Sequence, residues 1–234
     1  MKLENLKRLS LEKLKAIADD FGMATCGTKK DLVARLEQRY NDIGKYGRYT
    51  FLRQVGVEGK DARAFRVVDK QGNGPVLVMK VFKSSKSASK IQREGDLQRV
   101  AGIHGLAPEV VDINPDARYI VMEEMGETLF EVFRRQRGTL TLKQQREILA
   151  LFEKLDRCGV FHGDPNPLNI MTTLDNKQWK VIDFGFARRI TKRTKLGDRP
   201  NARLMTVGLI LQLRGLYSAA ALAVLEEVVK DIEG

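Results

Sequence analysis

Two polar segments near the middle of the chain constrain its fold more than any other feature. They read "HGDPNPLN" at 162–169 and "IDFG" at 182–185. The first segment presents Asp164 and Asn169 with four residues between them, and the second ends an apolar "KVI" strand with Asp183, nineteen residues after Asp164. Carboxylate and amide oxygens are the ligands that Mg²⁺ prefers. The pattern therefore predicts a fold that brings this loop and this strand end together.

A lysine upstream adds to this pattern. Lys80 lies in "VLVMKVF", an apolar strand in which a charge needs an anionic partner, and Glu94 on the following polar helix is the natural candidate. Transfer of a nucleotide γ-phosphate requires a cover for the phosphates, a cation beside them, oxygen ligands for Mg²⁺ and a carboxylate that orients the attacking hydroxyl. The sequence offers all four in order. Lys80 alone would better suit an edge strand, and only the downstream segments favour the phosphate-binding role.

Together, Lys80, Glu94, "HGDPNPLN" and "IDFG" resemble the protein-kinase-like superfamily. The resemblance implies that Asp164 orients the acceptor hydroxyl and that Lys80, braced by Glu94, clamps the phosphates of ATP. It also implies that Asn169 and Asp183 bind Mg²⁺. Pro165 and Pro167 would stiffen the loop between these groups because proline fixes φ.

The resemblance extends to two nucleotide-binding segments. "VMEEM" would be the hinge that holds adenine, with Met122 as gatekeeper and backbone groups of Glu123 and Met125 facing the base; a plain core strand remains the alternative. "VGVEGKDARAFRV" resembles the phosphate-covering loop of RIO kinases. Gly56 and Gly59 allow close backbone approach there, and a third glycine is absent.

Within the superfamily, the chain is similar to its compact members and departs from the common pattern in three positions. The short segment after Asp-Phe-Gly resembles RIO kinases and the small kinase of the KEOPS tRNA-modification complex, and aminoglycoside phosphotransferases share the "HGD" form. Gly163 replaces an arginine, so control by phosphorylation of the activation segment is not expected. Asn166 replaces a lysine near the γ-phosphate, and Val78 replaces an alanine of the lysine strand. The resemblance spans about 49–190.

The N-terminal region predicts two amphipathic helices within residues 10–40. Apolar residues recur at helical spacing after Ser10, a good N-cap, and again after Thr28, which has Asp31 three residues later as a capping partner. "LSLEKLKAIADDFGMATCGTKKDLVARL" is similar to a SAP motif, a small DNA-binding module. The resemblance implies binding of duplex DNA.

The turn before the second helix carries the phosphate-binding candidates. Backbone amides and cations at a helix N-terminus form a ready phosphate site. The candidates are Gly27, Thr28, Lys29, Lys30 and Arg35, with Arg39 as a possible extension. A capped surface helix that contacts a protein remains the alternative.

Net charge and composition indicate the class of binding partner and the cellular compartment. The formal net charge is +11, which favours polyanionic or acidic partners. A basic run, "RRITKRTKLGDRPNAR" at 188–203, follows Asp-Phe-Gly and suits either a nucleic-acid or acidic partner or a solvated surface. Cys26 and Cys158 form no metal-binding or disulfide pattern, and the charged N-terminus has no signal-peptide pattern. An intracellular protein of the cytoplasm or nucleus is expected.

The apolar segment 205–225 is interrupted by Gln212, Arg214 and Gly215, so two buried helices joined by a glycine turn are expected rather than a membrane span. Strands are expected at "FRVV" and "VLVMKVF" around the turn "DKQGNGP", and at "YIVMEEM". Helices are expected at "SASKIQREGDLQRVAGI" and "LTLKQQREILALFEKLDRCGV".

These observations predict an α+β, two-lobed minimal protein-kinase-like fold preceded by a small helical SAP-like module. The predicted boundaries are 1–42 for the module, 43–48 for a linker and 49–234 for the kinase-like domain, with an N-lobe at about 49–122 and a C-lobe at about 126–234. The expected activity is ATP- and Mg²⁺-dependent transfer to serine or threonine of a protein acceptor. A RIO-like ATPase, a small-molecule kinase and a nucleotide-binding nucleic-acid scaffold remain alternatives.

The combination of a SAP-like module with a minimal kinase also resembles an arrangement found in large DNA viruses, which would make this a viral protein of an infected cell. The sequence does not indicate an oligomeric state.

Overall fold

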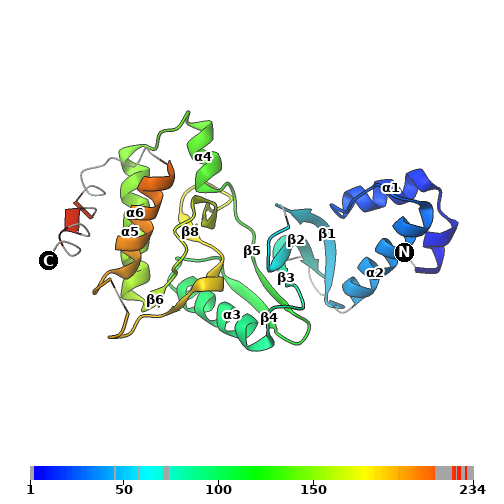
Figure 1. Ribbon diagram of the computed structural model, residues 1–234, viewed down its shortest axis with the longest axis horizontal. Helices are drawn as coiled ribbons and strands as arrows, with labels where there is room; N and C mark the ends of the chain where they lie inside the picture. The colour runs from blue at the N-terminus through cyan, green and yellow to red at the C-terminus, as the bar shows by residue number, and fades with distance from the viewer. Residues whose placement is uncertain are drawn as a thin grey trace. The chain divides into compact units, whose positions relative to one another are not determined.

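A computed structural model describes residues 3–44, 46–56, 58–70, 74–194, 196–213, 223–224, 226–227 and 230 (Figure 1). The chain divides into two compact units. The first comprises Met1–Ile91 with Asp112–Met122, and the second comprises Gln92–Val111 with Glu123–Gly234. The chain therefore passes from one unit to the other between Met122 and Glu123, within the segment predicted as the hinge.

The first unit begins with the predicted helical module. It contains a short 3₁₀ helix η1 (Leu3–Arg8) and the helices α1 (Leu11–Asp20) and α2 (Lys29–Gly44). Ser10 caps α1 as predicted, because its side chain accepts a hydrogen bond from the backbone N–H of Lys13. The apolar faces of the helices form their own small core, which includes Leu6, Leu14, Ala18, Leu32, Val33 and Leu36.

A five-stranded sheet completes the first unit and extends into the second. Its strands are β1 (Tyr49–Val55), β2 (Ala62–Asp69), β3 (Leu77–Phe82), β4 (Val110–Asn114) and β5 (Tyr119–Glu123), in the order β1-β2-β3-β5-β4. β2 pairs antiparallel with both β1 and β3. The three strands predicted from the sequence are confirmed, whereas β1 and β4 were not predicted as strands.

Side chains alternate between the two faces of this sheet, which separates Lys80 from the apolar core. Met79 and Phe65 are fully buried in an aromatic-rich core on one face. Lys80 shares the opposite face with Phe82, and its Nζ lies 5.4 Å from the centre of the Phe82 ring. Because successive side chains of a strand point to opposite faces, Lys80 lies half-buried although its strand is otherwise apolar.

Helix α2 packs on the aromatic face through Arg39. The Arg39 side chain is 6% exposed, and its guanidinium carbon lies 3.9 Å from the centre of the Phe65 ring and 5.7 Å from those of Phe21 and Phe51. Stacking of a guanidinium on aromatic rings is favourable and strengthens as the group is desolvated. The prediction that Arg39 extends a surface phosphate site is therefore wrong, because α2 directs this residue into the protein.

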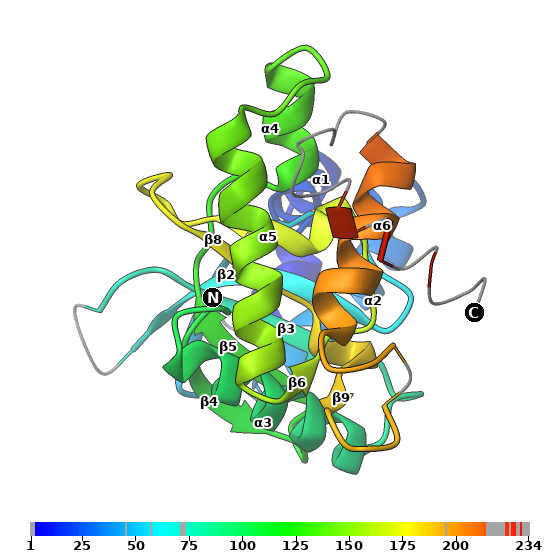
Figure 2. The same cartoon turned by 90° about the vertical axis from the view of Figure 1, so that its left-hand side faces the viewer.

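Among the described residues, four helices form most of the second unit: α3 (Ala88–Ile103), α4 (Leu129–Arg135), α5 (Leu142–Arg157) and α6 (Pro200–Leu213). The first turn of α3 still belongs to the first unit. Thr128 and Thr141 begin α4 and α5 with capping boxes. In Figure 2, α5 and α6 run side by side, and both contribute to the main apolar core.

The second unit differs from the predicted C-lobe because it includes most of helix α3. The sequence-based N-lobe, about 49–122, includes α3, but Leu97 and Ala101 of that helix pack into the core of the second unit. Gln98 also donates to the carbonyl of Pro108 at 3.2 Å. These contacts group most of the helix with residues 123–234.

Two small two-stranded sheets carry the polar segments of the site. β6 (Val160–Phe161) pairs with β9 (Arg188–Arg189), and β7 (Ile170–Thr172) pairs with β8 (Trp179–Val181). Single 3₁₀ turns lie between them: η2 (Pro167–Asn169) and η3 (Phe184–Phe186). Asp164 and Asp183 thus lie at the ends of short, paired strands.

The apolar segment 205–225 is only partly described. α6 begins at Pro200, before the predicted start, and it leaves Leu211 71% exposed, so the expectation of a wholly buried helix is wrong at that residue. The predicted glycine turn and most of the second helix lie outside the described residues. Among the helices that the structure describes, none has the length and apolarity needed to cross a bilayer.

Candidate active site

The loop residues predicted to act in catalysis lie at η2 and in the turn before it. Asn169 is 8% exposed and donates from Nδ2 to Oδ2 of the half-buried Asp164 at 2.8 Å. An amide that donates through its nitrogen keeps its oxygen for another partner. Asn169 Oδ1 is therefore the atom that can ligate a cation, while Asp164 is held in one orientation beside it.

The loop owes its shape to Asn166 and to the prolines. The Asn166 side chain accepts from the backbone N–H of Leu168 at 2.9 Å and so caps η2. Pro165 packs against α6 so closely that a Cβ on Gly208 would lie 2.3 Å from the Pro165 Cβ. Gln212 of the same helix donates to the Pro165 carbonyl at 2.6 Å. The departure at Asn166 thus has a structural role in this chain.

Asp183 follows β8 in a left-handed conformation, with φ at 61°. Aspartate tolerates this region better than most residues because its short side chain bonds to the nearby backbone, and here it accepts from the N–H of Gly185 at 3.2 Å. The preceding Ile182 donates its N–H to the carbonyl of Asn169 at 2.8 Å. The strand end and the catalytic loop predicted to cooperate are therefore joined directly by backbone.

His162, just before Asp164, contacts the segment around Asp183. Its ring is fully buried, lies edge-on to Phe184 with centroids 5.1 Å apart, and bonds through Nε2 to the carbonyl of Ile182 at 2.9 Å. A carbonyl accepts, so Nε2 carries the proton. Burial lowers the pKa of His162, which keeps the ring neutral.

A buried amide on α6 fixes the strand that leads into the loop, and sequence reasoning missed it. Asn201 is fully buried; its Oδ1 accepts from the His162 N–H at 2.8 Å, and its Nδ2 donates to the Val160 carbonyl at 2.7 Å. Nδ2 also donates to Asp156 Oδ1 at 2.8 Å, and the Asp156 carboxylate accepts two backbone N–H groups at the start of α6. Burial raises the pKa of Asp156, and these bonds partly oppose that effect.

No spacing rule links Asn201 to His162, because the two are thirty-nine residues apart. The only available signal was "RPN" before an apolar helix, which predicts a helix start and nothing more.

The predicted hinge is anchored on the same hairpin as Asp183. The Glu123 N–H donates to the Glu109 carbonyl at 2.9 Å, and the Glu123 carboxylate pairs with Lys180 Nζ at 2.6 Å. Gly126 donates to the Thr172 carbonyl at 2.7 Å, and a Cβ at Gly126 would lie 2.7 Å from Thr172 Oγ1. The Glu123 N–H is therefore engaged within the protein, and the contact of this segment with a base stays a prediction.

Lys180 is a second residue that sequence reasoning missed. Its side chain is 11% exposed, in the otherwise apolar strand β8. The argument used for Lys80, that a lysine in an apolar strand needs an anionic partner, would have found it.

The remaining predicted residues lie on separate units. Lys80 is on β3 of the first unit, whereas Glu94 is on α3 of the second and is 2% exposed. Their pairing stays a prediction. Gly56 has φ at 65°, and Gly59 donates to the Ala62 carbonyl at 3.0 Å, so both lie in the loop that joins β1 and β2.

The candidate DNA-binding turn before α2 is closed by local hydrogen bonds. Thr28 donates from its N–H and its hydroxyl to Asp31 Oδ2 at 2.8 and 2.7 Å, and Asp31 donates its N–H back to Thr28 Oγ1 at 3.3 Å. These bonds confirm the predicted cap and lower the pKa of Asp31. Gly27 has φ at 108°, and a Cβ there would lie 3.0 Å from Arg35 Nη2.

The cations of this turn differ in their availability. Lys29 and Lys30 are exposed at the first turn of α2. Arg35 instead donates to the carbonyls of Ala24 and Cys26. Arg35 therefore holds the turn closed in this structure, and the two lysines are the cations presented to solvent.

Comparisons with known proteins identify both regions. Residues 49–208, more than half of the chain, match the protein kinase domain. The chain belongs to the protein kinase family. Residues 5–41 of this kinase match the SAP domain. Both predicted resemblances are thereby confirmed, and the match to the kinase domain extends beyond residue 190 into α6.

One curated relative narrows the position within the family. The probable serine/threonine-protein kinase BUD32 homolog of Archaeoglobus fulgidus is 35% identical over 81 residues, which cover 34% of this kinase and 36% of the relative. The chain thus spans about a third of the length of that relative. This similarity supports the predicted likeness to small, atypical kinases.

Within this family, ATP and Mg²⁺ are the expected substrate and metal, and the residues fit them. Asn169 Oδ1 and the Asp183 carboxylate are hard oxygen donors on connected backbone, as Mg²⁺ requires. The chemistry of these two donors therefore fits Mg²⁺, and their binding of the metal stays a prediction.

Proposed function

We propose that this kinase transfers the γ-phosphate of ATP, in the presence of Mg²⁺, to a serine or threonine hydroxyl of a protein, and that its N-terminal module binds duplex DNA. The observation that carries the first part is the 2.8 Å bond from Asn169 Nδ2 to Asp164 Oδ2. It holds a carboxylate for the acceptor hydroxyl and an amide oxygen for the metal in one rigid loop.

Each residue then has one role in the transfer. Asp164 accepts a hydrogen bond from the acceptor hydroxyl and orients its oxygen for attack. It receives the hydroxyl proton as the new O–P bond forms and the bond between the γ-phosphorus and the oxygen of the leaving ADP breaks. Lys80, paired with Glu94, would hold the phosphates of ATP. Asn169 and Asp183 would ligate Mg²⁺, which when bound neutralises charge on the phosphates.

Structural residues support this mechanism by limiting motion. Asn201 and His162 fix the strand before Asp164, and the backbone bond from Ile182 to Asn169 fixes the distance between the two metal-binding segments. Lys180 holds Glu123 of the hinge. Preorganised groups lower the barrier because they need no rearrangement during the reaction.

The proposed DNA contact consists of Lys29, Lys30 and the backbone amides at the start of α2. A helix N-terminus attracts phosphate through its free N–H groups and its dipole. The match to the SAP domain supports this role. We therefore expect the kinase to act on proteins near DNA within the cell.

The test is an assay of the intact chain with labelled ATP and Mg²⁺, offering casein, duplex DNA and water as acceptors. We expect label on protein, and Asp164→Ala should lower turnover by about 10²–10⁴-fold with a smaller effect on the KM for ATP. Asp116→Ala, at an exposed aspartate of the first unit, is the matched control. Label released only to water would indicate an ATPase instead, and unchanged turnover in Asp164→Ala would move the chemistry elsewhere.

A further inference from the structure

The helical module and the strands β1–β3 have separate apolar cores, but both belong to the first compact unit. Domains joined by a chain segment move relative to each other unless a buried, apolar interface holds them together. Helix α2 takes part in such an interface. It carries the DNA-binding candidates Lys29 and Lys30 at its first turn and the buried Arg39 in its second half.

Arg39 contacts aromatic rings of both cores. Its guanidinium carbon lies 5.7 Å from the centre of the Phe21 ring, which packs on the core of the module. The same carbon lies 3.9 Å from the centre of Phe65, within the core of the sheet, and 5.7 Å from that of Phe51, which packs against it. Desolvation strengthens the attraction of a cation to these rings. A single buried side chain therefore joins the module to the sheet.

Two neighbouring segments extend the interface around Arg39. Gly22, in the turn after α1, lies so close to β1 that a Cβ there would be 3.2 Å from the Cβ of Gln54. Tyr46, which follows α2, is buried in the core of the sheet, with ring centroids 5.5 Å from Phe51 and 5.4 Å from Tyr119. The chain therefore contacts the sheet where it leaves each of the two helices of the module.

The interface covers the back of the strands that carry Lys80. Phe65 of β2 pairs with Met79 of β3, and the next pair along the ladder joins Ala64 to Lys80. Successive side chains of a strand point to opposite faces, so the ring that Arg39 contacts and the Lys80 side chain lie on opposite faces of the same two strands. Opening of β2 and β3 would therefore disturb both the predicted phosphate clamp and the contacts of the module.

We propose that the module and the strands β1–β3 open and unfold as one unit, joined through Arg39, so that duplex DNA bound by the module stabilises the lobe that carries Lys80. A ligand that binds only the folded state stabilises every element that must unfold together with its site. If the module were only a tether, DNA would stabilise the module alone. This inference rests on the proposed binding of duplex DNA.

Hydrogen exchange of the intact chain, measured by mass spectrometry, tests the coupling. Peptides from α2, β2 and β3 would be compared without DNA and with a short duplex at about 100 times its Kd. Amides that exchange only through opening of the whole unit should then exchange up to about 100-fold more slowly, because the stabilisation corresponds to a factor of one plus the ratio of free ligand to Kd.

The outcomes separate the coupling from the DNA binding on which it rests. Slower exchange in α2 with unchanged exchange in β2 and β3 would show that the module is a tether, and would overturn the coupling while leaving the DNA contact intact. If the duplex did not bind the intact chain, the proposed DNA contact and the coupling would both be wrong.

Arg39→Met tests the route through the interface, because it keeps a long apolar side chain and removes the guanidinium. DNA should still slow exchange in α2, and the slowing in β2 and β3 should fall at least about tenfold. Arg8→Met removes the same charge from an exposed position of the module and should keep the full slowing. Equal slowing in the two variants would overturn the coupling through Arg39.

Lys29→Ala/Lys30→Ala changes only exposed residues and provides the decisive variant if Arg39→Met does not fold. At the same duplex concentration, the slowing in β2 and β3 should decrease together with the slowing in α2. Undiminished slowing in the strands would show that DNA reaches the sheet without the module, and would overturn the proposal.

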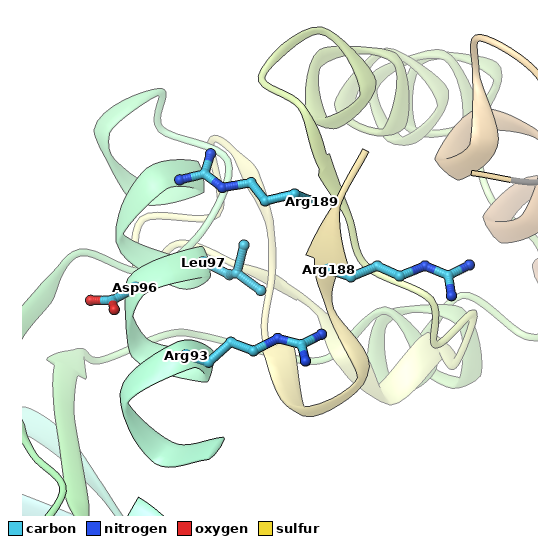
Figure 3. A pocket seen from close by; sticks show the side chains of 5 residues that line it. All are labelled: Arg93, Asp96, Leu97, Arg188 and Arg189. Carbon is cyan, nitrogen blue, oxygen red and sulfur yellow. The ribbon is translucent and has the colours of Figure 1, made fainter. Parts of the chain in front are cut away.

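A cationic cavity of about 490 Å³ in the second unit offers a different place for DNA to bind. In Figure 3, Arg93 and Arg189 extend toward each other's elements, α3 and β9, whereas Arg188 extends away. None of the residues that line this cavity belongs to the first unit. Slower exchange in α3 without slowing in α2, β2 and β3 would place the DNA there and overturn the proposal.

Discussion

The turn that begins α2 and the loop that carries Asp164 are both short polar segments, yet they are held in different ways. In the turn, the bonds of Thr28, Asp31 and Arg35 join residues at most eleven positions apart. In the loop and its flanking strand, His162, Asn201 and Gln212 form bonds across twenty to forty-seven positions. The turn is fixed by its neighbours in sequence, and the loop by distant elements.

This difference matches what each region has to do. A phosphate-binding turn needs only exposed cations and free amides, which a helix start supplies locally. A catalytic loop must hold its groups to a fraction of an ångström, and such precision requires side chains locked by surrounding structure. The four predictions that follow test the contrast, beginning with the largest expected effect.

Asp183→Asn should abolish transfer, a loss of about 10³-fold or more, because a bound metal contributes several kcal/mol to stabilising the transition state. Nucleotide binding without metal should largely survive, since the change removes a charge and little packing. Labelled-ATP assays and titration with a fluorescent nucleotide in EDTA measure the two effects. Asp175→Asn on the β7–β8 turn is the control, and loss of metal-free binding would show that Asp183 is structural.

Asn201→Ala tests whether distant contacts hold the catalytic loop. It removes the side-chain partner of the buried His162 N–H and of the Val160 carbonyl, and a buried polar group left unsatisfied costs about 1–3 kcal/mol. Asp156 loses one hydrogen bond and keeps the two that it accepts from backbone N–H groups. Urea unfolding should show this loss, with kcat lowered more than the KM for ATP.

Gln212→Ala is the matched control for that experiment. It removes another α6 amide bound to the same loop, but at an exposed site, so its effect on unfolding should be much smaller. Equal effects of the two variants would contradict the importance of burial.

Lys29→Ala/Lys30→Ala tests the local turn. Each phosphate contact contributes about 0.9 to the slope of log affinity against log salt, so the double variant should flatten that slope by about two. Lys13→Ala/Lys15→Ala, which removes the same charge from exposed positions of α1, should flatten it less. If Lys29→Ala/Lys30→Ala had the same slope as the unmodified protein, the DNA contact would lie elsewhere. The basic run 188–203 would then be the next candidate.

Point variants are preferable to deletion of the module. Removal of α2 would take away Arg39 and uncover Phe65 and Phe51 of the sheet. A shortened chain could therefore lose activity through instability alone.

His162 provides the smallest effect, a dependence of stability on pH. Its pKa is lowered in the folded protein and is about 6.5 when unfolded, so the unfolded chain binds more protons just below pH 6.5. The free energy of unfolding should fall as pH drops below about 6.5, by at most about 1.4 kcal/mol per pH unit for one proton. His162→Gln should remove this component, and His104→Gln, at an exposed histidine, should not.

The titration of Asp156 changes stability with pH in the opposite direction to that of His162. The unmodified protein and His162→Gln must therefore be compared at each pH. The pKa of Asp156 is raised on folding, so the folded state binds its proton more tightly and gains stability as pH falls toward its ordinary value. A pH profile of His162→Gln identical to that of the unmodified protein would contradict the assignment of a buried, neutral ring.

The sequence by itself determined the elements and the chemistry that depend on neighbours. Caps at Ser10 and Thr28 follow from one side chain and the N–H groups within three positions, and the strands around Lys80 follow from alternation and turn residues. Asp164, Asn169 and Asp183 could be nominated because their spacing is a property of a single short segment or of two segments in a fixed order.

Only the tertiary structure decided which side chains face inward and which groups are held in place. It buried Arg39 against Phe65, engaged Arg35 in the turn, and brought Asn201 and Gly208 to the segments around Asp164. These outcomes depend on which distant elements pack together, and packing is set by the summed burial of many apolar side chains rather than by any local pattern.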